Sequence, residues 1–140
     1  MKALALLPLL VLAACAAPPP ATRVAMIEVT TASFHGSTST QIFADGTRID
    51  DVGRTDGGPP RHGVTQISPE AYARAAAVLA RDGAKTKAAL APQAVPCMDY
   101  GTDLVRADPA VAGFDQVTTS CPDVAVSALM ADVLSALTPP

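Results

Sequence analysis

Apolar and polar residues alternate with a period of two in the first half of the chain after residue 23. Apolar side chains over residues 24–29, continued by β-branched threonines to residue 31, predict a half-buried strand. Further strands are expected over residues 38–44 and 47–52, because the intervening Asp45-Gly46 is a strong signal for a two-residue hairpin turn. Residues 64–67 can add a short further strand.

A helix is expected to begin at Ser68-Pro69-Glu70, which combines a serine cap, a proline at the first helical position and an acid in the first turn. Gly83 is expected to end it, with one or two further turns over residues 84–90. Glu70 and Arg74 are spaced as a solvent-side pair. The residues expected on the buried side of this helix are Tyr72, Ala76 and Leu79.

The clearest amphipathic helix closes the chain and opens at Cys121-Pro122-Asp123. Its apolar residues follow the helical spacing rule without a gap. They are Val126, Leu129, Met130, Val133, Leu134 and Leu137. This helix is expected to lie across the sheet as the main core element.

The N-terminal residues follow a different pattern. Lys2 precedes an apolar run that is too short to cross a bilayer as a permanent helix, and the run ends in Leu12-Ala13-Ala14-Cys15. This stretch resembles the lipobox of bacterial lipoproteins. The resemblance implies a signal peptide of residues 1–14, a diacylglyceryl group on the Cys15 thiol and an acyl chain such as palmitate on the new amine.

A proline-rich spacer is expected over residues 15–22, followed by a single domain over residues 23–138. Ala16 stands where enterobacterial lipoproteins retained in the inner membrane carry aspartate. The resemblance therefore favours an outer-membrane anchor facing the periplasm.

Cys97 and Cys121 remain as a pair after lipidation, and in an exported protein such a pair is typical of a disulfide. A hairpin centred on Pro109 would place Leu104 opposite Phe114, and the same register would close the two cysteines. That register also sets Asp103 against Asp115, which is unfavourable by up to about 1 kcal/mol. A slip of two residues would relieve this repulsion and lose the cysteine match.

The order of these elements predicts an α+β domain, with an antiparallel sheet of four to five strands, two helices packed on one face and one disulfide. The layout is similar to that of small α+β domains in bacterial lipoproteins. That resemblance carries no activity with it.

The charge balance limits the possible partners. The chain has 10 basic and 13 acidic residues, and Lys2 leaves with the signal peptide. A net negative charge disfavours nucleic acid as a partner, and the absence of tryptophan disfavours a stacking platform for bases or sugars. The expected partners are the membrane, through the lipid on Cys15, and an envelope protein or a small ligand, with no cofactor.

Residues 54–63 contain Gly57-Gly58-Pro59-Pro60 and are expected to form an exposed loop. Exposed loops commonly carry binding residues. The candidate contact residues of this loop are Arg54, Asp56, Arg61 and His62. No nucleophile-elbow, zinc-protease, Walker or dinucleotide-binding pattern occurs, so the sequence assigns neither a catalytic residue nor a metal ligand.

The leading hypothesis is a non-catalytic, membrane-anchored lipoprotein of the periplasm that binds a partner, for example as an inhibitor or accessory factor of an envelope enzyme. The alternative is a small hydrolase or metal-dependent enzyme of the envelope using His62 with Asp50, Asp51 or Asp56. The two hypotheses differ in space, because an enzyme needs these groups to converge in a cleft.

Overall fold

The computed structural model describes residues 24–56, 58–90 and 97–139. The expected signal peptide, the lipobox cysteine Cys15 and the spacer up to residue 22 lie outside the described residues. The strands, in chain order, are β1 (Met26–Ser33), β2 (Gly36–Phe43), β3 (Thr47–Arg54), β4 (Arg61–Gln66), β5 (Thr102–Val111) and β6 (Phe114–Thr119). The helical segments are α1 (Pro69–Val78), η1 (Leu79–Gly83), α2 (Ala84–Ala89) and α3 (Val124–Ser135).

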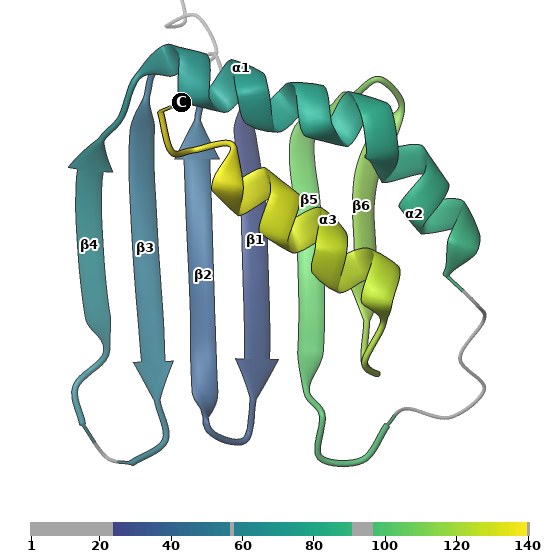
Figure 1. Cartoon of the computed structure of the whole chain (residues 1–140). Helices are drawn as coiled ribbons and strands as arrows, with labels where there is room; N and C mark the ends of the chain where they lie inside the picture. Colours follow the sequence, from purple (N-terminus) through teal and green to yellow (C-terminus); the bar gives the residue numbers. More distant parts are fainter. Residues whose placement is uncertain (1–23, 57, 91–96, 140) are drawn as a thin grey trace, which may run out of the picture.

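The six strands form one antiparallel sheet in the order β4-β3-β2-β1-β5-β6 (Figure 1). The α+β class is confirmed, but the sheet has six strands where four to five were expected. The extra strand is β4, which begins three residues before the predicted run and pairs with β3 along its whole length. The chain turns between β2 and β3 at the predicted place, with Gly46 at a φ of 85°. The predicted two-residue loop is wrong, because three residues, 44–46, separate Phe43 from Thr47, and Ile42 pairs with Arg48.

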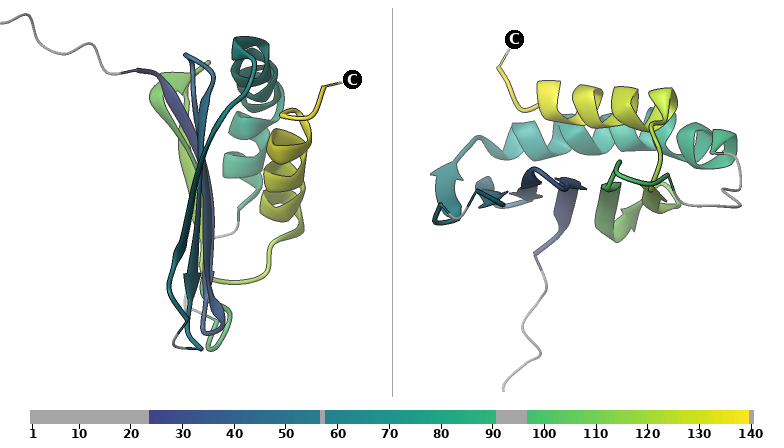
Figure 2. Two further views of the ribbon diagram at one scale, coloured as in Figure 1. Left: turned by 90° about the vertical axis from the view of Figure 1, so that its left-hand side faces the viewer. Right: turned by 90° about the horizontal axis from the view of Figure 1, so that it is seen from below.

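Both helices pack on one face of the sheet, as expected (Figure 2). The apolar core between the layers draws on β1, β2, β5 and β6. Its largest fully buried apolar side chains are Ile27, Ile42, Leu79, Val105, Phe114, Val126 and Val133. No residue of β3 or β4 is buried.

The first helix does not end at Gly83, contrary to the sequence prediction. The backbone stays helical through Gly83, with φ of −58° and ψ of −48°, and α1, η1 and α2 run on as one helix. A Cβ atom at Gly83 would lie 2.7 Å from the ring of Phe114. Glycine at this position therefore permits close packing of the helix on β6 and does not act as a stop signal.

The buried stripe of α1 is turned slightly from the predicted one. Ala71 and Ala75 are its deeply buried residues, whereas Tyr72 and Ala76 are only partly buried. Arg74 joins the two helices, because its Nε donates to the carbonyl oxygen of Ala136 at 2.8 Å. A cation at this place satisfies a terminal carbonyl of α3 and interacts favourably with its dipole.

The stripe predicted for the last helix is largely confirmed. Val126, Leu129, Val133 and Leu137 are buried, whereas Leu134 is 36% exposed. The Asp123 side chain accepts a hydrogen bond from the backbone N–H of Val126 at 2.9 Å, which caps α3.

The Cys97–Cys121 disulfide is present, with 4.9 Å between the two Cα atoms. The predicted hairpin register is wrong by four residues: Leu104 lies opposite Thr118, and not opposite Phe114. The chain turns at Ala112-Gly113, where both residues have positive φ, and β5 continues through Pro109 with an irregular pairing. The cysteines therefore join segments just outside the hairpin.

The correct register also separates the two aspartates that were expected to oppose each other. Asp103 is buried opposite Thr119 and accepts a hydrogen bond from the Tyr100 hydroxyl at 2.5 Å. Asp115 pairs with Lys87 of α2, whose Nζ lies 2.5 Å from its Oδ1. The repulsion predicted between the two carboxylates does not arise.

Candidate functional site

The candidate contact loop is shorter than the sequence indicated. Arg54 ends β3, and Arg61 and His62 are the first residues of β4, so only residues 55–60 connect the two strands. Gly63 is accommodated within β4, where it pairs with Asp50. The expectation that Arg61 and His62 lie in a loop is therefore wrong, because a glycine in an edge strand does not end it.

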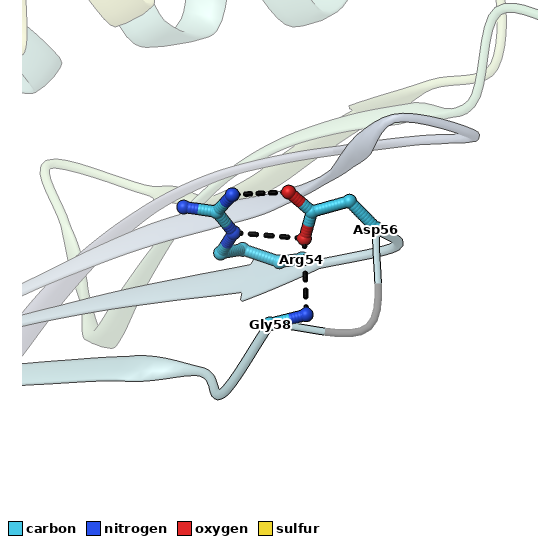
Figure 3. A network of polar contacts seen from close by, with 3 residues as sticks. All are labelled: Arg54, Asp56 and Gly58. Atoms are coloured by element: carbon cyan, nitrogen blue, oxygen red, sulfur yellow. Dashed lines mark hydrogen bonds and ion pairs between the residues drawn. The ribbon is translucent and has the colours of Figure 1, made fainter.

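Asp56 holds the connecting loop in place (Figure 3). Its carboxylate accepts hydrogen bonds from the Arg54 guanidinium, including one from Nε at 2.9 Å, and from the backbone N–H of Gly58 at 3.1 Å. The Arg54 guanidinium, followed by the Gly58 N–H, lowers the pKa of Asp56 below its ordinary value. The carboxylate thus stays ionised at neutral pH and ties the loop at Gly58 to Arg54 at the end of β3.

His62 meets one of the three aspartates proposed as its partners. Asp51 lies opposite His62 across β3 and β4, with 2.6 Å between His62 Nδ1 and Asp51 Oδ1. Asp50 points to the other face of the sheet, where its carboxylate accepts hydrogen bonds from Thr40 at 2.7 Å and Arg48 at 2.9 Å. The structure therefore brings Asp51 to His62, but neither Asp50 nor Asp56.

The Asp51 and His62 side chains are both exposed, on a strand pair that buries no residue. An exposed polar pair of this kind has no low-dielectric surroundings to strengthen its chemistry. Among residues 24–56, 58–90 and 97–139, no group of three or more His, Cys, Asp or Glu side chains is arranged to hold a metal ion.

A cleft of about 460 Å³ lies where the β1–β2 turn meets the end of β3. Its polar lining includes the hydroxyl residues Thr31, Ser33, Ser37, Thr38 and Thr55, together with His35, Arg54 and Asp56. Val52 adds an apolar side chain. Figure 1 shows that α1 and α3 cross the upper parts of the strands and leave the lower ends of β1, β2 and β3 uncovered.

His35 and Arg54 come together because of the strand register. Gly36 lies opposite Arg54, which brings the β1–β2 turn next to the last residue of β3. His35 is not among the contact residues that the sequence predicted. Counting outward from the predicted two-residue turn would have found the neighbouring segments, but one residue out of register, because it sets Gly36 opposite Thr55.

Phe34 adds an exposed aromatic side chain next to His35 in the chain, and it lines a separate depression with Gly101 and Thr102. It belongs to the same turn as His35 and is 67% exposed. Met98 and Val124, each 88% exposed, follow Cys97 and Cys121 closely, and the disulfide holds their two segments together. Exposed large apolar side chains in a braced region are typical of protein interaction surfaces.

Comparisons with known proteins found no relative. No protein-family model matches this chain, and no curated protein or solved structure matches it. None of the helices in the described residues is both long enough and apolar enough to span a bilayer.

Proposed function

We propose that this protein is a periplasmic lipoprotein, anchored through Cys15, whose domain binds a segment of another envelope protein. The observation that carries the proposal is the cleft lined by His35, Arg54 and Asp56, together with the exposed Phe34 next to His35 in the chain. The lipobox resemblance of Leu12-Ala13-Ala14-Cys15 supports the anchor.

The chemistry of the cleft suits a polypeptide segment. Its hydroxyl groups can donate hydrogen bonds to the C=O groups of a peptide backbone and accept them from its N–H groups, and Val52 offers an apolar contact. Phe34 supplies the kind of exposed aromatic anchor that protein interfaces concentrate near their centre. Arg54 is already paired with Asp56, so the site presents little net charge.

The cleft also lies at the end of β1 that is remote from the N-terminal segment. β1 begins at Met26, shortly after Val24, and ends at Ser33 in the cleft lining. A domain tethered at its N-terminus would therefore present the cleft at its far end.

Site-specific photo-crosslinking in cells tests the binding proposal. A photoreactive amino acid at Phe34 or at Thr55 is expected to crosslink to the same envelope protein. The matched control position is Arg81, which is exposed on η1 away from the cleft. Equal crosslinking from Arg81, or none from either Phe34 or Thr55, would contradict the proposal.

Intact-mass measurement of the protein from envelopes tests the anchor separately. The expected mass is that of the chain from Cys15 plus its lipid, rising by two hydrogens when the Cys97–Cys121 bridge is reduced. A Cys15→Ser variant is the matched control and should carry no lipid. A native mass without lipid would contradict the lipid anchor, and the crosslinking result would not depend on it.

A further inference from the structure

A corner of the sheet face that carries no helix is apolar. Met26 lies opposite Phe43 in the β1–β2 pairing, and Ile49 lies opposite Val64 in the β3–β4 pairing. Together with Val24 these residues form what we call the entry patch. Met26 and Phe43 point away from the helices, because their chain neighbours Ile27 and Ile42 are buried beneath them. 

The entry patch is both hollow and open. A depression of about 490 Å³ is lined by Val24, Met26, Phe43, Asp45, Thr47, Ile49 and Asp108. Val24 is 48% exposed and Val64 is 61% exposed. Figure 2 shows both helices on the other side of the sheet, so within the described residues no helix covers this corner.

The remainder of the same face is mostly polar, with the partly buried Leu104, opposite Thr30, as an apolar exception. Glu28 forms an ion pair with Arg106, with 2.7 Å between Glu28 Oε2 and Arg106 Nη2. The Thr30 hydroxyl donates a hydrogen bond to the Ser39 hydroxyl at 2.9 Å. The exposed pair of Asp51 and His62 completes this row. These groups need no partner beyond water, so the apolar corner is the part of the face that gains most from being covered.

The length of chain before the patch indicates what covers it. Val24 belongs to the patch and follows Cys15 by about nine residues, which span at most roughly 30 Å when fully extended. If acyl chains on Cys15 enter a bilayer, the patch is always within that distance of the lipid surface. Tethering makes the second contact intramolecular, so a weak apolar contact suffices.

We infer that the entry patch rests on the lipid surface in which Cys15 is anchored, with Phe43 and Met26 entering the interfacial region. This inference rests on the proposed lipidation of Cys15. The contact between the patch and the membrane orients the domain. The cleft lies one strand length, roughly 25 Å, from the patch and faces away from the membrane. Asp45 at the rim of the depression stays ionised, because the Thr47 N–H lowers its pKa, and it favours a zwitterionic over an anionic surface.

A pair of tryptophan reporters tests the inference, because the chain contains no other tryptophan. The full mature chain is coupled through the Cys15 thiol to a maleimide lipid in phosphatidylcholine vesicles, so the tether is supplied independently of native lipidation. Phe43→Trp reports on the entry patch, and Phe34→Trp, at the far end of β1, is the matched control.

Brominated acyl chains are expected to quench the F43W emission at least about twofold more than the F34W emission, since an interfacial side chain reaches roughly 5–10 Å into the headgroup region. Adding Ile49→Asp and Val64→Asp to F43W should remove the quenching, and anionic vesicles should weaken it. Equal quenching of both reporters, or none at F43W, overturns the inference.

The dependence of the F43W emission on protein concentration distinguishes a second copy of the chain from the membrane as the occupant of the entry patch. If F43W emission shifts with protein concentration in the absence of vesicles, and lipid does not quench it, a second copy of the chain covers the patch and the inference is wrong. Failure of native lipidation would appear in the intact mass and not in this vesicle measurement, so the two failures are distinguishable.

Discussion

Two groups of strands within the sheet are stabilised in different ways. The core side, which comprises β1, β2, β5, β6 and the helices, buries apolar side chains such as Phe114 and Val105 completely. The flange, which comprises β3 and β4, buries none and uses exposed polar pairs such as Asp51 with His62. Most of the stability therefore lies on the core side, while the flange supplies candidate contact residues at little cost to the fold.

The flange owes its position to backbone pairing. β3 pairs with β2 from Gly36 opposite Arg54 to Ile42 opposite Arg48, and β4 extends the same ladder. Its polar pairs are about one-third exposed at Arg48 and Asp50 and 46% to 62% exposed at Asp51 and His62, and exposed pairs contribute about 0–1 kcal/mol each. Side-chain changes on the flange should thus alter binding more than folding.

Removal of a core side chain is the strongest test of this contrast. Phe114→Ala is expected to lower the free energy of unfolding by about 3–5 kcal/mol, because the ring is fully buried between β6 and the first helix. Val64→Ala on the flange should change it by less than about 0.5 kcal/mol. Urea unfolding followed by circular dichroism measures both. Similar losses in the two variants would mean that the flange is also part of the core.

The disulfide provides the next largest effect, again on the core side. The double change Cys97→Ser and Cys121→Ser is expected to lower the unfolding free energy by about 3 kcal/mol, because the bridge closes a loop with a sequence separation of 24. Reduced wild-type protein is the control and should match the variant. If amide exchange in β3 and β4 accelerates as much as in β5 and β6, the two sides unfold as one unit.

The sequence predicted the place of the β2–β3 hairpin but not that of the β5–β6 hairpin, for a physical reason. Asp45-Gly46 is a compact turn signal that marks where the chain reverses, although the loop has three residues and the register differs by one from that of a two-residue turn. The second hairpin was predicted to centre on Pro109, but the chain turns at Ala112-Gly113. Pro109 lies in the irregularly paired part of β5 between Arg106 and Val111, where a strand tolerates proline without turning. The cysteine match favoured the wrong centre because the bridge joins segments outside the ladder.

The candidate site was predictable only in part. Arg54 and Asp56 were expected in the contact region and line the cleft. His35 enters it through tertiary proximity, which local patterns do not encode. Gly83 failed as a stop signal for a related reason, since its role depends on Phe114, which is remote in sequence.

Two glycine substitutions, one on the core side and one on the flange, are expected to change the stability of the protein in opposite directions. Gly83→Ala gains about 1 kcal/mol of helix propensity but places a Cβ against the Phe114 ring, so a net loss of about 1 kcal/mol is expected. Gly63→Ala on the flange meets no atom closer than 3.8 Å and should be neutral or stabilising by about 0.5 kcal/mol. Thermal unfolding of both variants measures the difference. Stabilisation by Gly83→Ala would show that the helix can move away from β6.

The smallest effect compares two exposed ion pairs, one on each side. Lys87 lowers the pKa of Asp115 to about 2, with smaller help from the Gln116 N–H, and so joins α2 to β6. Because the folded pKa lies below the ordinary value of 3.8, this stabilisation is present above about pH 4 and is lost as the pH falls towards 2. Lys87→Ala should move the Asp115 pKa, followed by NMR of its side-chain carboxyl carbon, back towards 3.8.

Arg54→Ala is the matched change on the flange, and it should raise the pKa of Asp56 in the same direction. The structural consequences should differ, because Lys87 and Asp115 lie 28 residues apart whereas Arg54 and Asp56 lie two apart. Amide exchange is therefore expected to accelerate in α2 for Lys87→Ala, but only in residues 55–60 for Arg54→Ala. Unchanged amide exchange in α2 would mean that apolar packing alone holds this end of the helix on β6. The difference in stability between the core side and the flange would then rest entirely on the burial of apolar side chains.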